Sequence, residues 1–210
     1  MSLMKISLDN IYPLIVPSNY YVKGTWELPH YAFPDQSFIL TWVIFDSGTT
    51  MNYLTQEQYQ ELSNSNEGWQ QKSFENLRLS IGENENFFTQ YKMAVGGQQL
   101  LWLSFMNSDG IGSSRILLSK ELKKAFPKGY YLAFPDRSCG LIIAKDISDT
   151  ELKEIKDMVK GMYDDATTYM SGQLHPPSDF ELPEQWTQPI DTEFTNVLTN
   201  EILKLRPVNL

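Results

Sequence analysis

The chain is poor in the residues that build cross-links and common metal sites. Its 210 residues include one cysteine, Cys139, and two histidines, His30 and His175. A single thiol cannot form an internal disulfide, and two imidazoles without a cysteine pair do not give the ligand spacing of a zinc site. We therefore expect a cytoplasmic protein that folds without a metal or any other cofactor.

Basic residues are also scarce. The 17 Lys and Arg stand against 26 Asp and Glu, which gives a formal net charge of −9. Nucleic acids and anionic membranes both recruit clustered Lys and Arg, so we expect neither as a partner. No apolar run approaches the roughly eighteen residues of a membrane-spanning helix. Another protein or a small ligand is left as the partner, and the composition leaves the oligomeric state open.

Glycine-rich phosphate-binding motifs are missing as well. Neither Gly-x-Gly-x-x-Gly nor Gly-Lys-Ser/Thr occurs, which argues against the common nucleotide-binding loops. What the chain does have is material for a core, because 41% of its residues are hydrophobic and 13% are aromatic. This composition is typical of a folded globular protein rather than a disordered one.

Strand-like segments arrive in pairs separated by turn residues. They are rich in β-branched and aromatic residues, which favours strands, and one pair is joined through Gly96-Gly97, a dipeptide that suits a tight hairpin turn. Long regular elements are not expected before residue 37, where prolines interrupt the apolar pieces. The predicted hairpins join residues 37–45 with 51–54, 87–95 with 99–105, and 130–134 with 140–144.

Helical signals lie between and after these hairpins. Thr55 with Gln58, and Ser148 with Glu151, have the spacing of capping boxes that begin helices. Apolar residues recur at helical spacing over residues 69–81, 115–126 and 148–172. We predict an α+β fold: a mostly antiparallel sheet built from hairpins and covered by helices on one face. Residues 1–172 would form this single domain, and the Pro-rich extension 173–210, ending in a short helix, would pack on it.

Asp46 carries the strongest catalytic motif. The segment Ile44-Phe45-Asp46-Ser47-Gly48-Thr49 is similar to the active-site loop of pepsin-like aspartic proteases. Those enzymes need two such carboxylates, and the chain has no second Asp-Ser/Thr-Gly loop, so a dimer would have to supply it. The alternative is a strand end at which Asp46 bonds to nearby backbone N–H groups.

The turn around residue 137 holds the other candidates. Cys139 beside Arg137 is a candidate nucleophile, although no histidine base can be placed next to it, and a small buried residue is the competing interpretation. Asp136 and Arg137 are candidate ligand-binding residues for a carboxylate or phosphate. Their structural alternative is to hold the hairpin turn through backbone hydrogen bonds.

Several separated segments resemble one family, the YtpQ-like bacterial proteins of unknown function. The similarity extends over about residues 10–175, in the same order, although Ser138 stands where the family turn carries an acidic residue. It implies a bacterial protein and brings no established activity, cofactor or catalytic residue. The segments are residues 38–46, Asn52-Tyr53-Leu54-Thr55, Ser73-Phe74-Glu75-Asn76-Leu77-Arg78, residues 114–118 and residues 129–137.

From these features we expect a non-catalytic domain that binds another protein or a small ligand. Exposed aromatic residues such as Trp186, Tyr20 and Tyr21 are the candidates for a partner surface, because Trp and Tyr dominate binding hot spots. The competing explanation is that these rings pack on the core. The alternative function is a hydrolase built around Asp46 or Cys139.

Overall fold

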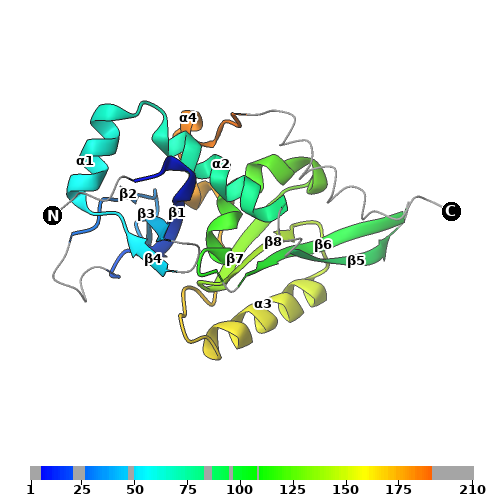
Figure 1. Ribbon diagram of the computed structural model, residues 1–210. Coiled ribbons are helices and arrows are strands. Elements are labelled where there is room, and N and C mark those ends of the chain that lie inside the picture. The colour runs from blue at the N-terminus through cyan, green and yellow to red at the C-terminus, as the bar shows by residue number, and fades with distance from the viewer. Residues whose placement is uncertain are drawn as a thin grey trace.

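Two antiparallel sheets with helices around them make up the protein (Figure 1). This computed structural model describes residues 6–20, 27–46, 50–82, 87–94, 97–107 and 109–190. The predicted α+β class and its hairpins are confirmed. The strands divide between two four-stranded sheets, however, where the sequence predicted one.

The first sheet is built around β3, which pairs with β1, β2 and β4. The first seven residues of β3 are buried, as expected for a central strand. The prediction that no long element lies before residue 37 was wrong, because the seven-residue strand β1 forms despite Pro13 and Pro17. Among the described strands, β1 pairs with β3 alone and is therefore an edge strand. On an edge strand, residues whose backbone nitrogen faces away from the partner need no N–H donor, so proline is tolerated at those positions. The strands are β1 Ile11–Pro17, β2 Tyr31–Ala32, β3 Phe38–Asp46 and β4 Thr50–Tyr53.

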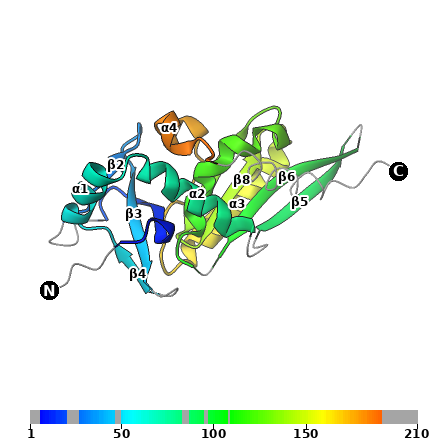
Figure 2. The same cartoon turned by 45° about the horizontal axis from the view of Figure 1, so that its top comes forward.

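The second sheet places two hairpins side by side in the order β5-β6-β8-β7. Strands β5 and β6 reach beyond the rest of the molecule, as Figure 2 shows. Each hairpin was predicted, and the pairing of β6 with β8 joins them. The strands are β5 Phe87–Ala94, β6 Gly97–Met106, β7 Tyr130–Asp136 and β8 Cys139–Ala144.

Helices α1, α2 and α3 begin where the sequence predicted, and both capping boxes are present, whereas the helix expected over residues 115–126 is a 3-10 helix that begins at Gly112. The long helix α3 was expected to reach Gly172 but ends at Asp164. The chain turns back there because Asp136 of β7 accepts hydrogen bonds from the backbone N and the hydroxyl of Thr168. The α-helices are α1 Gln56–Ser65, α2 Trp69–Gly82, α3 Asp149–Asp164 and α4 Glu184–Thr187, and the 3-10 helices are η1 Leu8–Asn10, η3 Gly112–Ala125 and η4 Pro177–Phe180.

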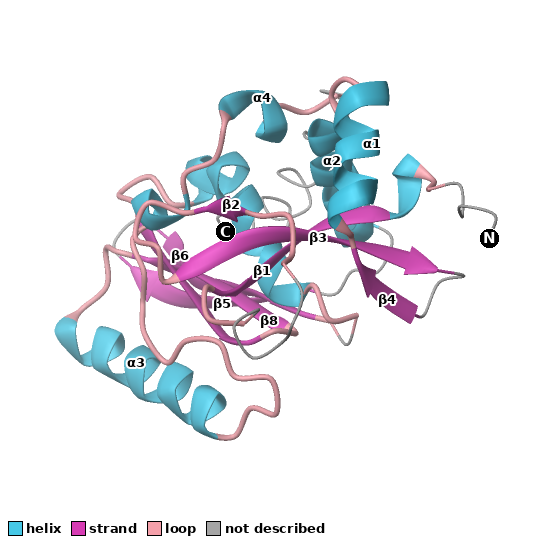
Figure 3. Cartoon of the chain, turned by 90° about the vertical axis from the view of Figure 1, so that its left-hand side faces the viewer, coloured by secondary structure: helices cyan, strands magenta, loops and turns pink. Residues whose placement is uncertain are grey.

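The second sheet is covered on both of its faces. Helix α3 packs Ile155 and Val159 against one face, and Figure 3 shows it set apart from the other helices. Helix η3 lies on the other face and approaches the sheet very closely. A Cβ at Gly112 would lie 1.9 Å from the Ser138 carbonyl oxygen, and one at Gly140 would lie 2.8 Å from Ile116. These glycines therefore serve close packing.

The extension after α3 packs on the core up to residue 190. His175 pairs with Leu132 of β7 through two backbone hydrogen bonds, so the chain continues the sheet beyond its edge. Phe180 then inserts among buried rings, 5.2 Å from Phe134, and Trp186 packs 5.7 Å from Trp42. The helix predicted near the end of the chain lies outside the described residues.

A buried charge cluster fastens this extension to α2. The Arg78 side chain is only 1% exposed and binds Glu75 at 2.8 Å and Glu121 at 2.6 Å. Its remaining nitrogen donates to the Thr187 carbonyl, and Glu75 also accepts from the Ile190 backbone N–H. One guanidinium thus compensates the buried Glu75 and the partly buried Glu121, and its removal would leave both carboxylates without a cation.

Candidate functional site

Asp46 ends β3, where it is exposed and faces Thr50 across the β3–β4 pair. The next residues, 47–49, lie outside the described residues. The loop that would define an aspartic-protease site therefore has no described geometry. Acid proteolysis at Asp46 stays a prediction.

Cys139 begins β8 in the small core beneath α3. It is buried against Ile155 and Val159, and burial, followed by the charge of Asp136, raises the pKa of its thiol to about 12. A nucleophilic cysteine needs the opposite shift, because the thiolate is the reactive form. This is the environment of a structural cysteine.

Asp136 fastens the turn between β7 and β8. One carboxylate oxygen accepts from the backbone N of Ser138 at 2.8 Å and the other from the backbone N of Thr168 at 3.1 Å, and both hydroxyls also donate to it. Burial acts to raise its pKa, but these hydrogen bonds together lower it. The backbone of Arg137 donates to the Thr168 carbonyl, and its guanidinium interacts with Tyr53. These contacts favour the structural interpretation, and ligand binding here stays a prediction.

Two of the three aromatic residues expected at a partner surface, Trp186 and Tyr20, pack against other rings. Trp186 is half-buried and lies 5.3 Å from Tyr31. Tyr20 is 37% exposed, and its hydroxyl accepts a 2.8 Å hydrogen bond from Tyr53. Tyr21 lies outside the described residues. Packing explains Trp186 better than a partner surface does.

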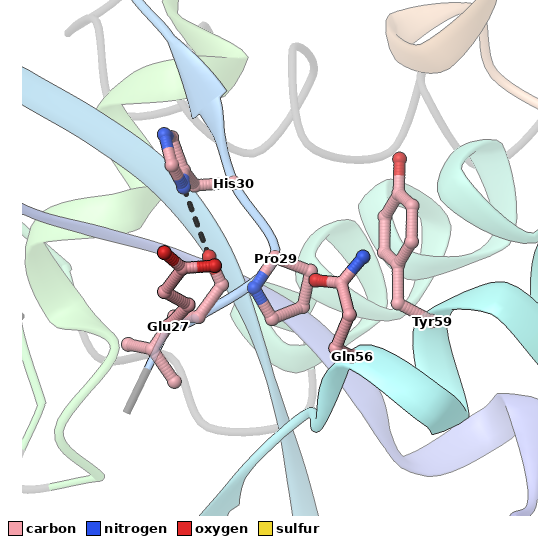
Figure 4. Close-up of a pocket in the computed structure, with 6 residues that line it drawn as sticks. Glu27, Pro29, His30, Gln56 and Tyr59 are labelled. Atoms are coloured by element: carbon pink, nitrogen blue, oxygen red, sulfur yellow. Dashed lines mark hydrogen bonds between the residues drawn. The ribbon is translucent and has the colours of Figure 1, made fainter. Parts of the chain in front are cut away.

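A pocket of about 360 Å³ opens between α1 and the segment before β2. Figure 4 shows Gln56 and Tyr59 coming from α1, and Glu27, Pro29 and His30 from the other side. The segment is fixed because the buried Thr41 hydroxyl donates to the Pro29 carbonyl at 2.9 Å. Leu28 and Pro29 are the buried, apolar part of the lining, and the exposed Glu27, His30 and Gln56 form a polar rim with Tyr59.

His30 has a defined tautomer within this rim. Its Nδ1 lies 2.9 Å from the Leu28 carbonyl oxygen (Figure 4). A carbonyl can only accept, so Nδ1 must carry the proton, and Nε2 of the neutral ring is an acceptor. The rim thus combines an imidazole, the Glu27 carboxylate, the Gln56 amide and the Tyr59 phenol.

A second polar cluster lies where the extension passes the turn between β2 and β3. Ser171 Oγ is 2.7 Å from His175 Nε2, and His175 Nδ1 is 3.8 Å from an Asp179 oxygen. Asp35 comes from the turn before β3, and its carboxylate, the imidazole and Asp179 each place one ligand atom within 4.8 Å of the others. A serine in contact with a histidine that in turn faces an aspartate is also the arrangement of a nucleophilic triad.

Burial favours the uncharged forms of His175 and Asp179. Burial lowers the pKa of His175, so its ring is neutral near pH 7. Burial, and then the charge of Asp35, raise the pKa of Asp179. Two carboxylates therefore face each other across an uncharged ring.

Little in the sequence indicates this cluster. Ser171, His175 and Asp179 are spaced four residues apart, a pattern that reads as one face of a helix, yet η4 begins only at Pro177. Asp35 is far away in the chain and joins them only because Phe180 and His175 pack against Phe38. The single available signal was a histidine between two hydroxyl or carboxylate residues in a Pro-rich segment.

Comparisons with protein-family models, curated proteins and solved structures find no match to this chain. The resemblance to the YtpQ-like family therefore stays a prediction. None of the described helices has both the length and the apolar character needed to cross a bilayer.

Proposed function

We propose that the protein is a non-catalytic binding domain whose ligand is a small molecule held in the pocket beside α1. The observation that supports this most is the pocket itself, because its lining combines buried apolar residues with several polar side chains. Its volume of about 360 Å³ suits a small metabolite.

The chemistry of the rim favours a ligand with a cationic or hydrogen-bond-donating group. Glu27 supplies a carboxylate, and among the described residues that line the pocket there is no Lys or Arg. The overall charge of −9 also attracts cations. The apolar part of the ligand would lie on Leu28 and Pro29. Small amines with an aliphatic or aromatic body are the class we propose.

Ligand-observed NMR with a library of small primary and aromatic amines tests this proposal. Gln56 is exposed at the start of α1, so Gln56→Trp would fill the pocket without disturbing the core. Gln60→Trp, at another exposed position of the same helix, is the matched control. We expect amines that bind the wild type to bind Gln60→Trp equally and to lose at least about tenfold in affinity for Gln56→Trp. Equal binding to both variants, or no binding to the wild type, would refute the proposal.

A hydrolase is the second candidate function, and the specific observation behind it is the 2.7 Å contact between Ser171 Oγ and His175 Nε2. In such an enzyme His175 would take the serine proton while Asp179 held Nδ1–H. Against it, Ser171 Oγ already accepts from the Gln173 backbone N–H at 3.2 Å, and the side chain is nearly buried.

A fluorophosphonate probe distinguishes the two functions. It labels a serine that a neighbouring base activates, so covalent labelling of the wild type at Ser171, lost in Ser171→Ala, would establish the hydrolase. We expect no labelling.

A further inference from the structure

Asp35, His175 and Asp179 bring three ligand atoms to one place from two distant parts of the chain. The atoms lie within 4.8 Å of one another, and His175 Nδ1 is 3.8 Å from Asp179 Oδ2. Ligands of a tetrahedral ion bound at about 2.0–2.1 Å are separated by roughly 3.4 Å. Asp35 is exposed, so a rotation of its side chain can close the remaining gap.

His175 is held rigidly with one ring edge toward the carboxylates. Its backbone is bridged to Leu132, and its ring stacks on Phe134 at 5.0 Å with an interplanar angle of 18°. Phe38 and Phe180 each contact the ring edge-on at 5.7 Å. A side chain fixed from this many directions is prearranged for binding rather than free to adapt.

Ser171 can set the tautomer that a metal ligand needs. If Nε2–H donates to the Ser171 hydroxyl oxygen, Nδ1 carries the lone pair and points at Asp179. The other ring nitrogen of a metal-bound histidine commonly makes a hydrogen bond of this kind. The same contact thus orients the imidazole as a neutral nitrogen ligand.

Positive charge is missing from this cluster. Across the part of the chain that the structure describes, every other salt bridge pairs a carboxylate with Lys or Arg. Among the described contacts, Asp179 is paired only with His175, and Asp35 accepts only the Ser37 backbone N–H. Two close carboxylates without a cation repel each other, and a bound divalent ion would remove that repulsion.

We propose that Asp35, His175 and Asp179 form a binding site for a divalent first-row transition metal ion such as Zn²⁺. One imidazole nitrogen and two carboxylate oxygens are ligands that Zn²⁺ accepts, and three protein ligands leave a fourth position for water or another ligand. The imidazole favours Zn²⁺ over Mg²⁺, which prefers an all-oxygen shell. The ion would also tie the extension to the turn before β3.

Isothermal titration with Zn²⁺, using untagged full-length protein treated with a chelator, tests this site. We expect one Zn²⁺ per chain, with Mn²⁺ bound more weakly and Mg²⁺ not measurably. Asp35→Asn should weaken Zn²⁺ binding by at least about tenfold, since second-shell changes alone cost that much. The variant should fold normally, because Asn keeps the oxygen that accepts from Ser37. His175→Gln should lose binding further.

Asp165→Asn is the matched control, since Asp165 is an exposed aspartate at the end of α3. It should bind Zn²⁺ as the wild type does. Wild-type protein that binds no Zn²⁺, or Zn²⁺ binding that Asp35→Asn and His175→Gln leave unchanged, would overturn the proposal. Labelling of Ser171 by a fluorophosphonate would do the same, because it requires Nε2 to accept the serine proton.

Discussion

Two carboxylate pairs in this molecule have opposite surroundings. Glu75 and Glu121 share the guanidinium of Arg78, which is buried between them. Asp35 and Asp179 share only His175, whose pKa is lowered by burial. Both clusters lie along the same C-terminal extension, one at residues 187–190 and the other at residues 175–179.

The difference separates a structural cluster from a binding one. Arg78 donates to all of its neighbours within the fold, so nothing further is needed to compensate Glu75. Burial is the main cause of the raised pKa of Glu121, and Arg78 partly offsets it. Around His175 the fold holds the two carboxylates in place, but no Lys or Arg is paired with them among the described salt bridges. A cation from solution should bind most favourably where carboxylates are held in place but no Lys or Arg compensates their charge.

Arg78→Met should have the largest effect on stability. It leaves Glu75 and Glu121 buried without a cation, and breaking a buried ion pair by removing one partner costs about 3–5 kcal/mol. Urea denaturation followed by tryptophan fluorescence measures the loss. The triple variant with Glu75→Gln and Glu121→Gln should recover part of it. A loss below about 1 kcal/mol in the single variant would show that the cluster is not what fastens the extension.

Glu151→Gln should have a smaller, pH-dependent effect at the start of α3. The hydrogen bond from Lys92 and then that from the Ser148 backbone lower the pKa of Glu151 from about 4.5 to about 2. Because the folded pKa is depressed, the stabilisation is complete above about pH 4.5 and is lost as the pH falls toward 2. The variant should lose about 0.5–1 kcal/mol at pH 7 and flatten the stability curve in that window.

Glu154→Gln is the control for that measurement, since Glu154 is an exposed carboxylate on the same helix. Its curve should follow the wild type. Identical curves for both variants would mean that the capping box contributes nothing through its charge.

Asp35→Asn should produce the smallest change, and in the opposite direction. In metal-free protein it removes the repulsion with Asp179, so the free energy of unfolding should rise by a few tenths of a kcal/mol. Glu75→Gln, which neutralises a carboxylate of the compensated cluster, should instead cost about 1–3 kcal/mol. Thermal unfolding with a chelator present compares the two. Equal losses in both variants would erase the distinction between the clusters.

The sequence predicted elements whose signals are local. The capping residues Thr55 and Ser148 and the apolar run that became β3 each act within a few neighbours, so they could be found without a structure. Strand β1 was missed because its prolines are tolerated only at an edge, and an edge is a property of the sheet. The end of α3 was misplaced because Asp136, about 30 residues earlier, pulls the chain back.

The candidate sites were harder to predict because most of their contacts join residues that are far apart in the chain. Asp136 could be assigned a turn role because its partner Ser138 is two residues away. The pocket joins α1 to residues 27–30, and the cluster joins Asp35 to His175, so both depend on tertiary packing that no spacing encodes. Only the buried nature of Cys139 could be inferred from residue type.

The distinction between the compensated Arg78 cluster and the proposed metal site is tested most directly by crystals grown with Zn²⁺. Diffraction would be measured on both sides of the zinc absorption edge. An anomalous peak bounded by Asp35, His175 Nδ1 and Asp179, absent from crystals of Asp35→Asn, is the predicted result. Zinc bound elsewhere, or a zinc-free cluster in which His175 holds the same contacts, would contradict it.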